Sequence, residues 1–578
     1  MKFQINHHKQ YIFSKIRIYF LFIMILLSFN FLSLDAQELT YSKYWIAFTD
    51  KDNTPYNIEN PQAFLSDKAI ERRQRYDIAI DETDLPVSPM YIQNIKDLGI
   101  EVLYTSRWFN GAVVMLESLA ELEQVLQLDF VESTEPVSRL KKQASKHKKA
   151  INAFQNATFK VKRFSEMQTQ AHEKAYYGTS FHQLKMLNGD LLHANGYTGE
   201  GMTVAIIDAG FKKVDEIEAF SYLFENGKIL GTKDFVDGDD NVYGNSSHGT
   251  NVFAIMAANL PNVYVGAAPD ADYYLLRTEE GASETTIEEY NWIAAAEFAD
   301  SAGVDVINTS LGYSTFDDEN MDYTYADMDG NTTHITNGAD MAARKGILVV
   351  ASAGNQGNKA WQYVTAPADA DSILTVGAVD SLQNYAFFSS QGTTADGRVK
   401  PNVVGQGLGT AYVGTNGMTA SGNGTSYSAP LVAGLMTCLW QANPAISNIE
   451  LIALIEKNAN QYENPDVFLG YGLPNFYTAL LEATENPIAN FDRDLLAFVY
   501  PNPFTDDANV YYYANMDENI RIELFNLAGK KLDSYEKNVR ENTPYNLNFE
   551  HWNRYPKGTY IIQITNSVQK KNLKAIKL

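Results

Sequence analysis

The amino-acid sequence predicts an α/β protein whose largest part is a doubly wound parallel sheet with helices on both faces. A small ferredoxin-like α+β module is expected before it and a C-terminal β-sandwich after it. The chain has 578 residues, 45% of them hydrophobic, which is too long for one compact core and implies several domains. Between residues 176 and 485, apolar runs without alternation are separated by amphipathic helices, as in strands that are buried on both faces. After residue 490, apolar and polar residues alternate, as in antiparallel strands with one solvated face.

Composition excludes several functions. Lys and Arg number 46 against 70 Asp and Glu, so the net charge is −24, and an excess of this size repels phosphate backbones. We therefore expect no nucleic-acid partner. The single cysteine, Cys438, excludes disulfide frameworks, cysteine-rich zinc sites and iron–sulfur clusters.

Residues 1–36 have the pattern of a signal peptide. Basic residues precede an apolar run over residues 18–34, and the small residue Ala36 ends it. Polar residues interrupt the run, so a retained membrane anchor is the alternative interpretation. No later stretch approaches the ~20 apolar residues that a span needs. We expect a secreted protein with no stable membrane span after removal of the signal.

Residues 37–137 predict a small domain. Strand candidates at 44–48, 100–104 and 112–116 and a last one through Val131 are interleaved with helices, in the order strand–helix–strand–strand–helix–strand of a ferredoxin-like module. One helix is expected to begin at Asn60-Pro61 and run toward Arg75, and another to begin at Ser88-Pro89 and end at Gly99.

Residues 138–175 form a basic linker in this interpretation. From Ser138 to Ser165, nine Lys and Arg residues occur without one acidic residue, which is typical of an exposed segment that proteases cut. A solvated helix or arm is the alternative.

Strands and helices alternate in the central region, residues 176–485. The predicted strands cover 203–207, 273–277, 304–308, 347–351 and 373–376, and the predicted helices cover 287–299, 335–344, 428–441 and 448–458. Functional groups of such sheets collect just beyond the carboxyl ends of the strands.

Three polar residues occupy positions of this kind. Asp208 ends a buried strand, His248 starts an apolar helix, and Ser426 stands at a glycine-rich turn that enters a helix. Each alone is more often a cap or a structural residue. Together they supply a hydroxyl nucleophile, a base that removes its proton, and a carboxylate that orients the base. Asn355, in a small-residue loop after another buried strand, could donate a hydrogen bond to the oxyanion of an acyl-transfer intermediate.

These segments, in the order Asp, His, Ser, resemble the subtilisin-like serine peptidase (subtilase) family over residues 176–485. The quoted motifs are VAIIDAG at 204–210, SHGTNV at 247–252, NTSLG at 308–312, ILVVASAGN at 347–355, KPNVV at 400–404 and NGTSYSAP at 423–430. The resemblance implies a triad of Asp208, His248 and Ser426, an oxyanion hole at Asn355, and a peptide-binding edge at Ser310, Leu311 and Gly312. Ala209, Asn251 and the segment 405–407 depart from the family pattern, but none of these changes removes a reacting group.

Two further resemblances concern the flanking regions. Residues 37–137 resemble the inhibitory propeptides of subtilases at the level of fold pattern, which implies that the basic linker is the excision region. Residues 495–578, with YPNPF at 500–504, NLAGKK at 526–531 and KGTY at 557–560, resemble the type A C-terminal sorting domain of the type IX secretion system. This implies secretion or attachment to the outer cell surface; a carbohydrate- or protein-binding β module is the alternative.

The resulting hypothesis is a secreted serine endopeptidase that is made as a zymogen. Its expected partners are polypeptide substrates, its own propeptide and the type IX machinery. No cofactor is required by this chemistry. Asp237, Asp239, Asp240 and Asn241 could hold Ca²⁺, although Gly238 and Gly244 favour a solvated turn there. A binding protein on an inactive peptidase scaffold and a secreted esterase with the same triad are the alternative functions.

Overall fold

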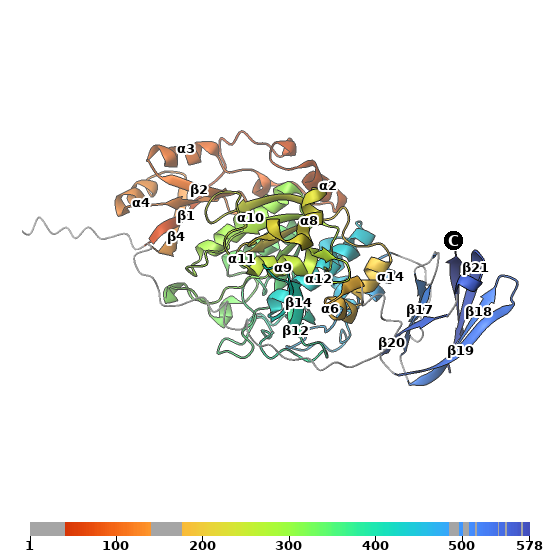
Figure 1. Cartoon of the computed structure of the whole chain (residues 1–578). Helices are drawn as coiled ribbons and strands as arrows, with labels where there is room; N and C mark the ends of the chain where they lie inside the picture. Colours follow the sequence, from red (N-terminus) through yellow and green to blue (C-terminus); the bar gives the residue numbers. More distant parts are fainter. Residues whose placement is uncertain are drawn as a thin grey trace, which may run out of the picture. The chain divides into compact units, whose positions relative to one another are not determined.

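The computed structural model describes residues 41–139, 176–484 and most of 496–577 (Figure 1). The predicted signal peptide and residues 140–175 of the predicted linker lie outside the described residues. Contacts divide the chain into two compact units. Residues 55–86 and 106–109, which belong to the expected domain 37–137, group with the unit that contains residues 176–484.

The first unit is an antiparallel sheet with two helices. Its strands are β1 (Tyr41–Phe48), β2 (Glu101–Ser106), β3 (Gly111–Met115) and β4 (Val131–Arg139), and its helices are α3 (Pro89–Asp97) and α4 (Leu119–Val125). The sheet order is β2-β3-β1-β4. Ile46, Ile95 and Val114 are fully buried in its core. The order of elements along the chain, β1-α3-β2-β3-α4-β4, is that of the expected ferredoxin-like module.

A helix of the second unit begins later than the sequence predicts. Residues 61–63 form only a 3₁₀ turn, and the Asn60 side chain caps nothing. The α-helix α2 spans Asp67–Arg75 and is capped by Ser66, whose side chain accepts a hydrogen bond from the backbone of Ala69. Ser66 followed by Asp67 is the stronger N-terminal signal, because the hydroxyl satisfies a free N–H of the first turn.

The second unit is built on a seven-stranded parallel sheet in the order β13-β12-β11-β10-β5-β9-β6. The strands are β5 (Thr203–Asp208), β6 (Ile229–Asp234), β9 (Asp272–Arg277), β10 (Val306–Thr309), β11 (Leu348–Ser352), β12 (Leu374–Val379) and β13 (Val403–Gln406). The two edge strands, β6 and β13, were not predicted from the sequence. β6 is partly exposed along its length, so it lacks the continuous apolar run of a buried strand.

Helices cover both faces of this sheet (Figure 1). They are α6 (Phe181–Met186), α7 (Gly189–Ala194), α8 (Glu218–Glu225), α9 (His248–Ala257), α10 (Ile287–Ala302), α11 (His334–Arg344), α12 (Thr425–Ala442), α13 (Asn448–Lys457) and α14 (Phe476–Ala483). Alternate residues of β5 enter different cores: Val204 and Ile206 pack with residues of α9 and α12, whereas Ala205 and Ile207 pack with residues of α10 and α11. This is the predicted doubly wound arrangement.

The C-terminal region contains two antiparallel sheets. One has the order β16-β17-β20 and the other β19-β18-β21-β22. Their strands are β16 (Leu496–Tyr500), β17 (Asn509–Ala514), β18 (Glu518–Asn526), β19 (Lys531–Val539), β20 (Thr543–Asn548), β21 (Gly558–Thr565) and β22 (Lys570–Lys577). Both sheets contribute to one core, which includes Val510, Ile522, Trp552 and Ile562.

Within the described residues, no helix is long and apolar enough to cross a membrane.

Candidate active site

An aspartate and a histidine meet at the carboxyl end of β5. Asp208 is the last residue of this strand and is fully buried. The Nδ1 atom of His248, the first residue of α9, lies 2.8 Å and 3.0 Å from the two carboxylate oxygens of Asp208. The backbone N–H of Ala209 also donates to Asp208 Oδ1 at 2.7 Å. The carboxylate therefore fixes the orientation of the imidazole and leaves Nε2 as its reactive nitrogen.

A glycine permits the close approach that forms this pair. A Cβ atom on Gly249, the residue after His248, would lie 2.5 Å from the backbone oxygen of Gly210 and 3.0 Å from Cβ of Asp208. Any larger residue would push α9 away from the end of β5. The His-Gly pair of the sequence motif is thus explained by packing.

Ser426 lies in the first turn of α12, behind Gly424, whose φ of +154° favours glycine. Its hydroxyl donates to the backbone oxygen of Ser310 at 3.3 Å, and the Ser310 hydroxyl donates to the backbone oxygen of Ser426 at 3.1 Å. The nucleophile candidate and the candidate substrate edge are therefore hydrogen-bonded to each other in both directions.

A proline makes this reciprocal contact available. Pro430 lies inside α12, four residues after Ser426, and has no N–H to donate to the Ser426 carbonyl as helical geometry would require. That carbonyl accepts from the Ser310 side chain instead. The sequence motif shows Pro430, but its effect on Ser426 follows only from the structure.

Asn355 is held beside Ser426 by the preceding residue. Its Oδ1 accepts from the backbone N–H of Thr425 at 2.9 Å and from the Thr425 hydroxyl at 3.1 Å. The Thr425 hydroxyl in turn accepts from the N–H of Gly354 at 3.2 Å. With Oδ1 turned to Thr425, the other end of the amide, the Nδ2 donor, is directed away from that residue.

The predicted peptide-binding edge follows β10. Ser310 and Leu311 are buried, and the Leu311 side chain packs in the core with Trp292, so only the backbone of Leu311 is suited to meet a peptide. Tyr313, the next residue after Gly312, exchanges backbone hydrogen bonds with Ala366 at 2.9 Å and 3.1 Å.

Tyr427 was not singled out in the sequence, although it directly follows Ser426. Its ring is nearly parallel to the His248 imidazole, with centroids 6.4 Å apart, and stacks on Tyr412 at 5.3 Å. Burial, together with the neighbouring Tyr412, raises the pKa of Tyr427 to about 12. Tyr427 therefore lies beside the His248 imidazole as an uncharged aromatic side chain.

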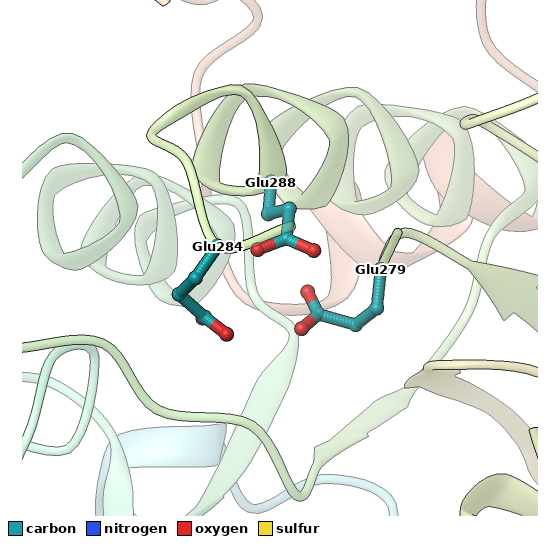
Figure 2. Close-up of side chains that lie close together, drawn as sticks. All are labelled: Glu279, Glu284 and Glu288. Atoms are coloured by element: carbon teal, nitrogen blue, oxygen red, sulfur yellow. The ribbon is translucent and has the colours of Figure 1, made fainter. Parts of the chain in front are cut away.

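Three glutamates that were not predicted from the sequence converge near this end of the sheet. Figure 2 shows the side chains of Glu279, Glu284 and Glu288 close together. One carboxylate oxygen from each lies within 4.8 Å of the others. The Tyr313 hydroxyl donates to Glu279, and the backbone N–H of Glu280 donates to Glu288 at 2.7 Å. The oxygens suit a hard cation such as Ca²⁺, but two of the carboxylates already accept hydrogen bonds from the protein.

In the other calcium candidate, residues 237–241, side-chain oxygens already form ion pairs or hydrogen bonds with the protein. Asp237 forms an ion pair with Arg277 at 2.6 Å, and Asp239 accepts from the N–H of Asn241 at 2.8 Å. The Asn241 side chain accepts from the N–H of Tyr243 at 3.2 Å. These contacts are typical of a solvated turn.

Comparison with known proteins gives three matches along the chain. A model of the subtilase family matches residues 199–472, a Bacteroidota peptidase S8 propeptide domain matches residues 43–152, and a secretion system C-terminal sorting domain matches residues 498–577. The parallel α/β sheet and the first of these matches indicate the class of subtilisin-like serine peptidases.

Among characterised relatives, subtilisin E of Bacillus subtilis (strain 168) is 32% identical over 316 residues, which are 54% of this chain and 73% of the relative. Subtilisin of Bacillus pumilus is 31% identical over 300 residues, 51% of this chain and 97% of the relative. Among solved structures, MycP1 with its N-terminal propeptide removed is 22% identical, with a TM-score of 0.43, over 52% of this chain and 96% of that one.

The chain belongs to the subtilase family. It is a subtilisin-like serine endopeptidase with a propeptide and a type IX sorting domain, which places it outside the cell, either secreted or attached to the outer surface.

Proposed function

We propose that this chain is a secreted zymogen that hydrolyses peptide bonds through an Asp208–His248–Ser426 triad and an acyl-enzyme intermediate. The observation that carries the proposal is the 2.8 Å contact between Asp208 and His248 at the strand end, with Ser426 in the first turn of α12, the helix that packs on α9. Polypeptides are the substrates, and residues 37–137 act as the intramolecular inhibitor until the basic linker at 138–175 is cut. The type IX machinery exports the chain.

The reaction begins with the Ser426 hydroxyl, which donates to Ser310. Rotation of the Ser426 side chain toward His248 lets Nε2 take the hydroxyl proton as the oxygen attacks the scissile carbonyl. Asp208 keeps Nδ1 protonated and stabilises the imidazolium that forms. The substrate backbone lies along Ser310, Leu311 and Gly312.

Negative charge then develops on the former carbonyl oxygen. Asn355 Nδ2 and the Ser426 N–H are the proposed donors, and the positive end of the α12 helix dipole adds to their field. The intermediate collapses when His248 gives the proton to the leaving amine. Water, deprotonated by His248, then attacks the acyl-enzyme carbonyl. His248 returns the proton to the Ser426 oxygen as the ester bond breaks, and the acyl group leaves as a carboxylic acid. The mechanism uses no cofactor.

The test is Ser426→Ala, with the exposed Ser421 of β15 (Thr419–Asn423) as a matched control position. We expect Ser426→Ala to lower kcat on a peptide substrate on the order of a million-fold and to abolish labelling by a fluorophosphonate. Ser421→Ala should leave both unchanged. Unchanged labelling in Ser426→Ala would refute the assignment, and hydrolysis of esters without peptides would favour the esterase alternative.

A further inference from the structure

Tyr427 connects the helix of the proposed nucleophile with the helix of the proposed base. It directly follows Ser426 in the first turn of α12 and is 7% exposed. Its ring makes an angle of 26° with the His248 imidazole, and the two ring centroids are 6.4 Å apart. The side chain next to the nucleophile therefore faces the base.

The hydroxyl of Tyr427 reaches the same helix as His248. Asn251 lies one helical turn after His248 on α9 and is 4% exposed. Burial and the neighbouring Tyr412 raise the pKa of Tyr427 to about 12, and a hydrogen bond with the Asn251 side chain partly opposes this rise. Tyr427 is therefore un-ionised at every pH at which a histidine acts as a base, and its ring and hydroxyl meet two side chains of α9.

A glycine makes room for this ring. The Tyr427 ring also stacks on Tyr412 of β14 (Leu408–Val413), at an angle of 25° and with centroids 5.3 Å apart. A Cβ atom on Gly422 of β15 would lie 2.5 Å from Cε2 of Tyr427 and 3.1 Å from Cε1 of Tyr412. Any larger residue at position 422 would therefore displace the buried Tyr427 ring.

The strand that carries Tyr412 is anchored beside this stack. The N–H of Ala411 donates to Gln183 Oε1 at 2.9 Å. The Ala411 oxygen accepts from the Tyr264 hydroxyl at 3.0 Å and from Gln183 Nε2 at 3.1 Å. Both Gln183 and Tyr264 are buried. Because Tyr412 is held in this way, it limits movement of the Tyr427 ring.

The geometry of proton transfer explains why such a restraint matters. The Ser426 hydroxyl donates to the backbone oxygen of Ser310 at 3.3 Å, so it must turn toward His248 before it reacts. Proton transfer then needs heavy atoms about 2.6–3.2 Å apart. That distance depends on how α9 and α12, which pack on each other, hold their side chains. A misplacement of about 1 Å can cost roughly 100-fold in rate.

We propose that Tyr427 is a positioning residue of this site, whose ring limits the orientation of the His248 imidazole and whose hydroxyl holds Asn251. These two contacts keep Nε2 of the base within reach of the Ser426 hydroxyl. Asp208 holds the imidazole at Nδ1, whereas the nearly parallel Tyr427 ring restrains tilting of the imidazole plane. Tyr427 acts through His248 and not on the substrate. The inference rests on the proposed peptidase function.

The experiment compares variants of the full, processed chain by steady-state kinetics on a peptide substrate and by the rate of fluorophosphonate labelling. Labelling needs the same proton transfer from Ser426 but does not use the peptide-binding edge. Tyr427→Leu should lower kcat and the labelling rate roughly 10- to 100-fold, with KM within about two-fold of the parent. Tyr427→Phe retains the ring and should keep both rates within about three-fold. Parental rates in Tyr427→Leu, or a loss confined to KM, would overturn the proposal.

Tyr477→Leu is the matched control. Tyr477, on α14, is 5% exposed and belongs to the same hydrophobic core as Tyr427, so the same substitution removes a similar buried ring. The two leucine variants should lose similar free energies of unfolding, measured in the Ser426→Ala background, but Tyr477→Leu should keep the kcat and labelling rate of the parent. An equal loss of kcat in both variants would show a general effect on the fold and overturn the proposal.

Gly422→Ala displaces the ring without removing it, and it provides the test if Tyr427→Leu does not fold. The added methyl group should lower kcat and the labelling rate roughly 10-fold. Gly414, at the end of β14, is the matched position, because a Cβ atom there would make only ordinary contacts of 3.5 Å or more. Gly414→Ala should have the rates of the parent. Equal rates in the two alanine variants would overturn the proposal.

The outcomes separate this inference from the proposed function. Absent labelling of the parent enzyme would refute the proposed function and the positioning role together. Labelling of the parent at Ser426, with unchanged rates in Tyr427→Leu and Gly422→Ala, would refute the positioning role alone.

Discussion

Two carboxylates one helical turn apart on α10 show how neighbours decide the sign of a pKa shift. Burial alone would raise the pKa of Asp300, but Arg73, Arg107 and Arg72 outweigh it and lower the pKa. Burial dominates at Glu297, where Arg107 and hydrogen bonds only partly oppose it, and the pKa is raised. The difference is the number of guanidinium groups, since both side chains are removed from water.

These shifts predict how docking of the propeptide depends on pH. The lowered pKa of Asp300 contributes stability that is present above its ordinary value of 3.8 and is lost as the pH falls through the lowered value. The raised pKa of Glu297 contributes stability that is complete below its ordinary value of 4.5 and is lost as the pH rises through the raised value. Acidification from neutral pH to pH 5 should therefore not release the propeptide.

The measurement is gel filtration of the Ser426→Ala chain, cut in the linker by trypsin, at pH 7, pH 5 and pH 3. Co-elution is expected at the first two values. The lowered pKa of Asp300 confines any separation to the most acidic condition. Release at pH 5 would show that another titrating group controls the contact.

Asn355 gives a second prediction at the scale of one residue. If its amide stabilises the oxyanion, Asn355→Ala should lower kcat by about 10²–10³-fold, or about 2.7–4 kcal/mol, with little change in KM, because the bond forms in the transition state. Steady-state kinetics on a peptide substrate measures this. An effect on KM alone would mean that Asn355 binds substrate in its ground state.

At the scale of elements, a hydrogen bond joins α12 to the segment that follows β10. The backbone carbonyl of Ser426 has no helical donor because Pro430 lacks an N–H, and it accepts from the Ser310 hydroxyl instead. Ser310→Ala should leave the buried Ser426 carbonyl without its side-chain partner and destabilise the fold by about 1–3 kcal/mol. In the background of Pro430→Ala, the new N–H at position 430 can donate to that carbonyl. The same Ser310→Ala change should then cost less.

A double-mutant cycle measures this coupling. The four chains, all carrying Ser426→Ala to prevent self-digestion, are compared by denaturant unfolding. A coupling energy near zero would show that the Ser310 hydroxyl and the residue at position 430 do not share the Ser426 carbonyl.

At the scale of the whole molecule, the modules have separate cores. The C-terminal core is formed by residues between Ala497 and Ala575, and the two cores of the parallel sheet draw on other parts of the chain. Removal of a module with its own core exposes little of its neighbours' apolar surface.

Truncation after Thr484 should therefore give a peptidase with kcat/KM within about two-fold of the full chain once it is purified and processed. In cells that contain a type IX system, the truncated protein should stay inside the cell, because it lacks the sorting domain. Activity assays and cell fractionation test both statements. Export of the truncated protein at normal levels would show that the sorting signal lies elsewhere.

The sequence alone determined the class of protein, because the evidence for it is local. Uninterrupted apolar runs identified the five inner strands of the parallel sheet, and short motifs placed Asp208, His248 and Ser426 next to strand ends or helix starts. The edge strand β6 was missed because its partial exposure weakens the local signal, and the late start of α2 was missed because two capping residues compete. The edge strand β13 is buried but only four residues long, too short for a distinct local pattern.

Only the tertiary structure decided which distant side chains meet. Arg72 and Asp300 are 228 positions apart, Ser310 and Ser426 are 116 apart, and nothing in the local pattern of either pair indicates its partner. The same holds for the split of residues 37–137 between two compact units. Local propensity fixes strands and helices, whereas buried ion pairs and shared carbonyls depend on how those elements pack.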